Sequence, residues 1–258
     1  YFNLLFVPLT LLLLVFLAVG PATNWKKQSA EVILLPLRKV LLAAVVIAIG
    51  VPLAFFGNWP WHVGVTVGLC AWVLGGQLVD IARKTQHAAT RVQGLKKLTR
   101  SYWGMQFAHL GLLVTALGIA FTTAYSIEKD VRLAPGESIT VNDYVFRFDG
   151  VEDHQGPNYV AQRGTLLVSH DGFSETLHPE KRIYRVQQNP MTEAAISGNS
   201  FRDLYVALGE PLDAGAWAVR IYHKPMIRWV WFGAVLMAFG ALLAMLDKRY
   251  RLKATGGR

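Results

Sequence analysis

Five stretches of this sequence are almost free of charge and rich in Leu, Val, Ala and Phe, and they constrain the fold more than any other feature. A helix rises 1.5 Å per residue, so about 20 apolar residues cross the hydrocarbon core of a bilayer. The runs are residues 2–20, 39–56, 61–82, 103–124 and 227–246. The second run is short and contains Pro52 near its end, so a buried core helix is the alternative for that run alone. We expect five transmembrane helices.

The composition agrees with a membrane protein and excludes several classes of site. Hydrophobic residues make up 53% of the chain and charged residues only 17%, too apolar a balance for an ordinary soluble domain. The single cysteine, Cys70, lies in an apolar run, so this chain can form neither an internal disulfide nor a thiolate metal site. The sequence also contains no P-loop, no nucleophile elbow and no C-x-x-C-H motif.

The positive charge gathers in particular loops. Lys and Arg cluster in residues 21–38, in residues 83–102 and after residue 246, whereas the linker 57–60 carries no charge. By the positive-inside rule, the first, third and fifth helices run inward and the C-terminus is cytoplasmic. Anionic lipid near these loops accounts for the formal net charge of +9, so no nucleic-acid partner is expected.

The long segment between the fourth and fifth helices, residues 125–225, has a different pattern. It contains ten Lys and Arg residues against fourteen Asp and Glu residues, a net charge of −4. Aromatic and β-branched residues alternate with polar ones in short stretches, and turn sequences such as A-P-G-E, H-Q-G-P-N and S-H-D-G separate them. The clearest predicted strands lie at 144–149, 164–170, 182–187, 204–208 and 216–222. We expect a small antiparallel barrel or sandwich.

The predicted fold is therefore an α-helical transmembrane bundle with an inserted extracytoplasmic antiparallel β domain. Residues 1–124 form four helices with basic cytoplasmic loops, residues 125–225 form the β domain, and residues 226–258 form the last helix and a basic tail. The chain opens inside a hydrophobic segment without an initiator Met, so we interpret it as a piece of a larger or split protein.

His109 is the candidate functional residue of the helices. It lies six residues into the fourth run, about 9 Å from Trp103 along the helix axis. An ionisable residue at this depth costs free energy and usually has a partner or a function. Neutral imidazole is a natural axial ligand for haem iron, but an interhelical hydrogen bond and a proton relay are the alternatives. Asp80, near the end of the third run, is expected at the interface, which leaves the relay without a carboxylate partner.

A stripe of small side chains runs along the same helix beside His109. Such a stripe usually marks close helix packing, and a second interpretation is room for a flat porphyrin. The stripe consists of Gly104, Ala108, Gly111, Thr115, Gly118 and Thr122. Apolar residues on the histidine's own side would form a wall beside it: Met105, Leu112, Leu113 and Ala116.

The remaining histidines give weaker signals. His62, beside Trp59 and Trp61, is expected in an interfacial aromatic belt, and His87 is expected in solvent. Surface or sheet positions without ligand spacing are expected for His154, His170, His178 and His223.

Seven short motifs are spread over essentially the whole chain. They are Y-F-N at 1–3, M-Q-F-A-H-L-G at 105–111, E-K-R-x-Y at 180–184, M-T-E-A-A-I at 191–196, R-D-L-Y-V-A-L-G at 202–209, R-I-Y-H-K-P-M-I-R-W-V-W-F-G at 220–233 and D-K-R-Y-R at 247–251. Taken in order, these motifs resemble the C-terminal part of the CcmF family of bacterial cytochrome c maturation proteins. The specificity of the resemblance comes from the order of the motifs around the five helices and the large loop.

The resemblance implies a component of a haem lyase in the bacterial inner membrane. Proteins of this family act with CcmH and CcmI-type subunits, take haem from the chaperone CcmE and attach it to the C-x-x-C-H site of apocytochrome c. They also hold an intramembrane haem b with one histidine from each of two helices, and His109 matches one of these axial ligands to the haem iron. In this interpretation haem b passes electrons from a quinol and keeps the incoming haem or its carrier reduced.

The chain departs from the family pattern because it lacks the tryptophan-rich segment and the histidines that hold the substrate haem, and it lacks the second haem b histidine. These belong to the N-terminal part of such proteins, so catalytic residues cannot be assigned here. Gly104, Ala108 and Gly111 are expected to pack against haem on the basis of the stripe alone. Two other functions remain open: a membrane scaffold that recruits partners through the β domain, and a haem transporter.

Overall fold

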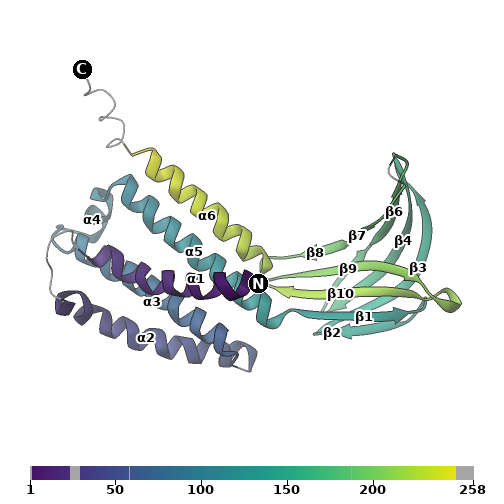
Figure 1. Cartoon of the computed structure of the whole chain (residues 1–258), viewed down its shortest axis with the longest axis horizontal. Coiled ribbons are helices and arrows are strands. Elements are labelled where there is room, and N and C mark those ends of the chain that lie inside the picture. The colour runs from purple at the N-terminus through teal and green to yellow at the C-terminus, as the bar shows by residue number, and fades with distance from the viewer. Residues whose placement is uncertain (1, 24–29, 58, 187, 248–258) are drawn as a thin grey trace, which may run out of the picture. The chain divides into compact units, whose positions relative to one another are not determined.

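The computed structural model describes residues 2–23, 30–57, 59–186 and 188–247. The chain divides into two compact units. One comprises Tyr1–Ala120 together with Trp229–Arg258 and is helical; the other comprises Phe121–Arg228 and is mostly β. An α-helical bundle with an inserted antiparallel β domain, as the sequence predicts, is therefore the fold of this chain (Figure 1).

The described part of the chain contains six α-helices and two short 3₁₀ turns, η1 (Gly20–Ala22) and η2 (Asp213–Gly215). The α-helices are α1 (Phe2–Val19), α2 (Ala30–Phe56), α3 (Trp61–Thr85), α4 (Arg91–Lys97), α5 (Arg100–Tyr125) and α6 (Ile227–Met245). Figure 1 shows α1 and α2 lying along α3, and α6 lying along α5. In the bundle core, Leu14 and Ala18 of α1 pack with Cys70 and Val73 of α3 and with Leu113 of α5.

The lengths of the first two helices differ from the prediction. Four helices, α2, α3, α5 and α6, are long and apolar enough to cross a membrane, whereas the described apolar part of α1, Leu4–Val19, is shorter. The second helix is not the short one, because α2 begins at Ala30 and not at residue 39. Arg38 and Lys39 lie within α2 and are exposed. Because their charged groups are not buried, the helix can continue through them.

The basic segment 83–102 is also more helical than predicted. Helix α3 continues to Thr85 and α5 begins at Arg100, so several basic residues of this segment lie in helical turns. The extra helix α4 lies between them, and its N-cap residue Thr90 accepts a hydrogen bond of 3.3 Å from the Gln93 amide. Two other groups of basic residues used for the predicted topology fall outside the described residues: Lys26 and Lys27, and the tail from Lys248 to Arg258.

Ten strands form the β unit. They are β1 (Ile127–Leu133), β2 (Ser138–Val141), β3 (Tyr144–Gln155), β4 (Tyr159–His170), β5 (Phe173–Leu177), β6 (Glu180–Tyr184), β7 (Pro190–Glu193), β8 (Ala195–Gly198), β9 (Arg202–Pro211) and β10 (Trp217–Pro225). One sheet has four strands in the order β1-β10-β9-β8. The other has six strands, in the order β2-β3-β4-β6-β7 with β5 paired to β4. All pairings among these strands are antiparallel.

The alternating aromatic and aliphatic residues fill the space between the two sheets. Phe146 and Phe148 of β3 are fully buried, and they pack in one core with Trp217, Val219 and Ile221 of β10. The opposite register would place these side chains in water, so the core fixes the pairing. The predicted S-H-D-G turn joins β4 to β5, with Asp171 and Gly172 both at positive φ, the conformation of a tight hairpin.

Candidate functional site

His109 lies on α5 beside a groove of about 370 Å³ in the helical unit. Residues of α1 and η1 form the opposite wall. The lining residues are Leu13, Phe16, Leu17, Gly20, Pro21, Met105 and His109. Apart from the imidazole, every side chain in this set is apolar, so a ligand here would meet one polar group in an apolar setting.

The imidazole of His109 has unused bonding capacity. Its Nδ1 atom is buried and has no hydrogen-bond partner among the residues that the structure describes. Buried polar atoms are nearly always paired, so an orphaned nitrogen beside a groove indicates a missing ligand or partner. The interhelical hydrogen bond considered from the sequence is absent from the described part of the chain at this nitrogen. The residues present therefore fit a metal-centred, apolar ligand such as haem.

The small-residue stripe faces a different neighbour, which corrects the prediction that it packs against haem. A Cβ atom added to Gly104 would lie 2.5 Å from the carbonyl oxygen of Gly240, and one added to Gly111 would lie 2.6 Å from that of Gly233. Thr115 donates a hydrogen bond of 3.4 Å to the carbonyl oxygen of Val230. Helix α6 thus covers Gly104, Ala108 and Gly111, and a porphyrin has no room there.

Each side of α5 has its own partner. Gln77 of α3 donates a hydrogen bond of 3.2 Å to the carbonyl oxygen of Gln106, and Leu113 is buried with Cys70 of α3. Successive residues of a helix turn by about 100°, so His109 projects away from the glycines that contact α6. The packing of α5 therefore leaves its histidine side directed at the groove.

A polar cluster centred on Asp80 lies about two helical turns from His109, toward the N-terminus of α5. This carboxylate is only 5% exposed, because neighbouring side chains of the helical unit cover it. It accepts a hydrogen bond of 2.7 Å from the Tyr102 hydroxyl and pairs with the Lys84 ammonium at 2.6 Å. Tyr102 and Lys84 both stabilise the buried charge of Asp80. Asp80 is therefore not an unpaired carboxylate available for a proton relay.

The β unit contains a second polar cluster, which sequence analysis missed. The Arg202 guanidinium is largely buried, lies 4.7 Å from the ring centre of Tyr144, and donates a hydrogen bond of 2.8 Å to the carbonyl oxygen of Ser197. Burial, and then the Arg202 charge, lower the pKa of His223, while Asp143 opposes them. His223 is a sheet residue of β10, as expected, but no sequence pattern predicts its buried neighbours.

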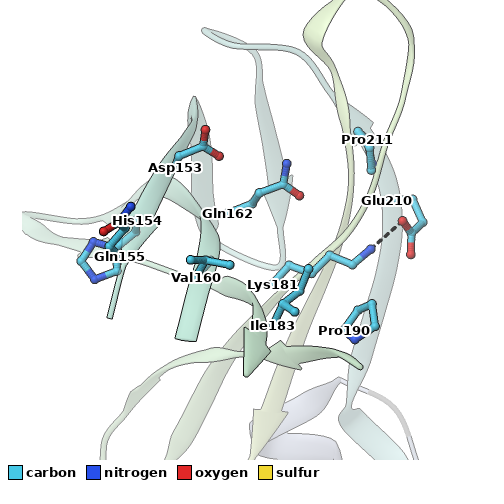
Figure 2. A pocket seen from close by; sticks show the side chains of 11 residues that line it. Asp153, His154, Gln155, Val160, Gln162, Lys181, Ile183, Pro190, Glu210 and Pro211 are labelled. Atoms are coloured by element: carbon cyan, nitrogen blue, oxygen red, sulfur yellow. Dashed lines mark ion pairs between the residues drawn. The ribbon is translucent and has the colours of Figure 1, made fainter. Parts of the chain in front are cut away.

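A cavity of about 600 Å³ lies on the β unit between the β3–β4 hairpin, β6, β7 and β9 (Figure 2). Figure 2 shows Lys181 reaching toward Glu210, with which it forms an ion pair of 2.5 Å. The other polar residues that line the cavity are Asp153, His154, Gln155 and Gln162. Among the described residues, no group of three or more His, Cys, Asp and Glu side chains has the arrangement of a metal site.

Comparison with known proteins agrees with this architecture. Residues 124–225 match the family model described as the CcmF C-terminal beta-sandwich. A cytochrome c-type biogenesis protein CcmF from Pseudomonas aeruginosa is 48% identical over 98% of this chain, and one from Escherichia coli is 40% identical over 99%. A solved structure titled cytochrome c heme lyase CcmF, 21% identical, covers 95% of this chain and 40% of its own, with a TM-score of 0.80.

These likenesses define a class of multi-helix membrane protein in which a β-sandwich is inserted before the last helix. Within that class, the chain is similar over nearly its whole length to CcmF proteins, and its residues 124–225 match the β-sandwich of their C-terminal part. The chain spans 38% of the length of each of these two relatives.

Proposed function

We propose that this chain is the C-terminal part of a cytochrome c haem lyase of the bacterial inner membrane, and that His109 binds the iron of a resident haem b. The orphaned Nδ1 atom of His109 beside an apolar groove supports this proposal most directly. The relatives named as cytochrome c-type biogenesis proteins, at up to 49% identity, support the wider role.

The residues of this chain would have separate parts in binding haem. His109 would hold the haem iron through an imidazole nitrogen, and a second histidine would come from the part of the protein outside this chain. Leu13, Phe16 and Leu17 exclude water from the groove and favour an apolar ring. Contact between α5 and α6 at Gly111 and Gly233 holds the helix that carries His109. When bound, haem b supplies one-electron transfer, with a quinol as the donor.

The reaction itself would take place elsewhere in the complete protein. The N-terminal part would hold the substrate haem delivered by CcmE, and the apocytochrome would arrive with CcmH and CcmI-type subunits. The β unit would lie in the periplasm, where these partners meet, and the C-terminus would be cytoplasmic. The acidic balance of residues 125–225 and the basic loops support this orientation.

Cytochrome c maturation in cells tests the functional role. The complete protein carrying His109→Ala should accumulate normally but give much less covalently attached haem in a reporter cytochrome c. His87→Ala is the matched control, because His87 is exposed near the end of α3 and does not line the groove. Full maturation with His109→Ala would refute a required haem b ligand at this position.

A scaffold function is the second candidate, favoured by the independent core and the cavity of the β unit. A Lys181→Glu change would break the ion pair with Glu210 and reverse the charge in that cavity. If recruitment is the main role, partner capture should fall with this variant while the haem spectrum is unchanged. Normal capture would argue against a scaffold function of this cavity.

A further inference from the structure

A second hollow lies on the same side of α5 as the His109 groove. It has a volume of about 490 Å³, and its lining residues are Lys84, Lys97, Leu98, Thr99, Ser101, Tyr102 and Met105. Met105 lines this hollow and the groove alike. Tyr102, Met105 and His109 are spaced by three and four residues, so they form one continuous stripe on the helix.

The two hollows differ in chemistry. The groove beside His109 is apolar, whereas the hollow beside Tyr102 contains two ammonium groups, two aliphatic hydroxyls and a phenol. Asp80 already pairs with Lys84 at 2.6 Å and holds Tyr102 at 2.7 Å, so these two side chains are fixed in place. Lys97, by contrast, has no carboxylate partner among the described residues, and its charge is available to a ligand.

A ligand that fits both hollows has three features. It has a flat apolar body, it has a group that binds imidazole, and it carries carboxylates at one edge. Haem has all three features, because its two propionates leave the same edge of the ring. Carboxylates are costly inside the hydrocarbon layer and are stabilised where a lysine meets them. From His109 to Tyr102 the helix rises about 10 Å. The charged hollow is therefore displaced from His109 along the axis of α5, on the same side of the helix.

We propose that Lys97, with the hydroxyls of Thr99 and Ser101, binds the propionate carboxylates of the haem that His109 ligates. This inference rests on the proposed function of His109 and adds the orientation of the ring, with its propionates toward the α4–α5 connection. Thr99 already accepts a hydrogen bond of 3.2 Å from the Tyr102 amide, which fixes the connection at the start of α5. Lys84 lines the same hollow, but its charge is already paired with Asp80.

Haem analogues test the orientation in the complete, haem-depleted protein in detergent. The dissociation constants of iron protoporphyrin IX and of its dimethyl ester are measured by absorption titration, and their ratio is compared between variants. The unaltered protein should prefer the free acid. Lys97→Gln should reduce this preference by up to about fivefold, the range expected for one exposed ion pair. Lys97→Arg should restore most of it.

Lys96→Gln is the matched control, because Lys96 is exposed on the same helix α4 but does not line the hollow. It should leave the preference unchanged. If the spectrum depends on His109 while Lys97→Gln leaves the preference unchanged, the propionate site is wrong and the iron ligand stands. If His109→Ala binds both compounds as the unaltered protein does, the proposed function fails and this inference fails with it.

Discussion

Gly104 of α5 and Gly240 of α6 meet backbone to backbone: a Cβ atom on either residue would lie 2.5 Å from the carbonyl oxygen of the other. This reciprocal contact brings two helices together that are more than a hundred residues apart in sequence. It also occupies the side of α5 that the sequence left open to a porphyrin. The histidine side of the helix is consequently the one available for a ligand.

The glycine contact predicts an unusual response to alanine. Gly104→Ala should destabilise the helical unit by about 1–3 kcal/mol, because the added methyl group overpacks the contact with α6. Gly50→Ala is the control, since a Cβ atom there meets nothing within 4 Å, and it should be neutral or slightly stabilising. Thermal unfolding of the detergent-solubilised protein measures both. Equal midpoints for the two variants would show that the helices do not pack in this way.

The polar cluster predicts that Asp80 stabilises the start of α5. Asp80→Asn should lower the free energy of unfolding by about 1–3 kcal/mol, because Lys84 loses its ion pair while an amide oxygen still accepts from Tyr102. Asp171→Asn, in an exposed hairpin turn that suits either residue, is the control. Chemical denaturation compares them, and an unchanged Asp80→Asn variant would contradict the buried pair.

The β unit should lose stability in acid through Glu180. Burial raises the pKa of this carboxyl. Hydrogen bonds of 2.6 Å from Arg182 and from Arg163 lower the pKa by more than burial raises it, so the net pKa lies below its ordinary value of 4.5. A lowered folded-state pKa means that stability is present above the unfolded-state value and is lost as pH falls through the folded-state value.

Glu180→Gln should therefore flatten the pH dependence of unfolding below about pH 4.5, the ordinary pKa of this carboxyl. At neutral pH the variant should be less stable by about 1–3 kcal/mol. Melting followed by tryptophan fluorescence from pH 3 to 7 measures the effect in the complete chain. Glu152→Gln, at an exposed position of β3, is the control. A Glu180→Gln variant with the full acid sensitivity of the parent would rule out this origin.

Local patterns predicted most of the architecture. Alternation in residues 144–149 and 216–222 predicted strands whose inward residues, such as Phe146 and Ile221, are fully buried. Charge and hydropathy place helix ends less well, because α2 continues through the basic pair Arg38 and Lys39 back to Ala30, so that two charged residues did not end the helix. The short strands β1, β2, β5, β7 and β8 were not predicted, because their four to seven residues show too little alternation of apolar and polar side chains to stand out from loops.

The candidate site was only partly predictable for a similar reason. His109 can be identified from the sequence alone, because it is a lone histidine well inside a long apolar run. The partner of a small-residue stripe, in contrast, depends on which helix arrives there, and Gly104 gives no sign that it will be Gly240. The buried partners of Asp80, and the second hollow at Lys97, likewise require Tyr102 and the α4–α5 connection to be placed in space.

Axial ligation of haem b by His109 is the central claim, and a reduced-minus-oxidised absorption spectrum tests it most directly. The complete protein is purified with His109 and with His109→Ala, and with His87→Ala as a control. We predict that the b-type α-band disappears in His109→Ala while the protein still accumulates, and that it persists in His87→Ala. An unshifted band of full intensity in His109→Ala would contradict the account, and His109 would then be a packing residue.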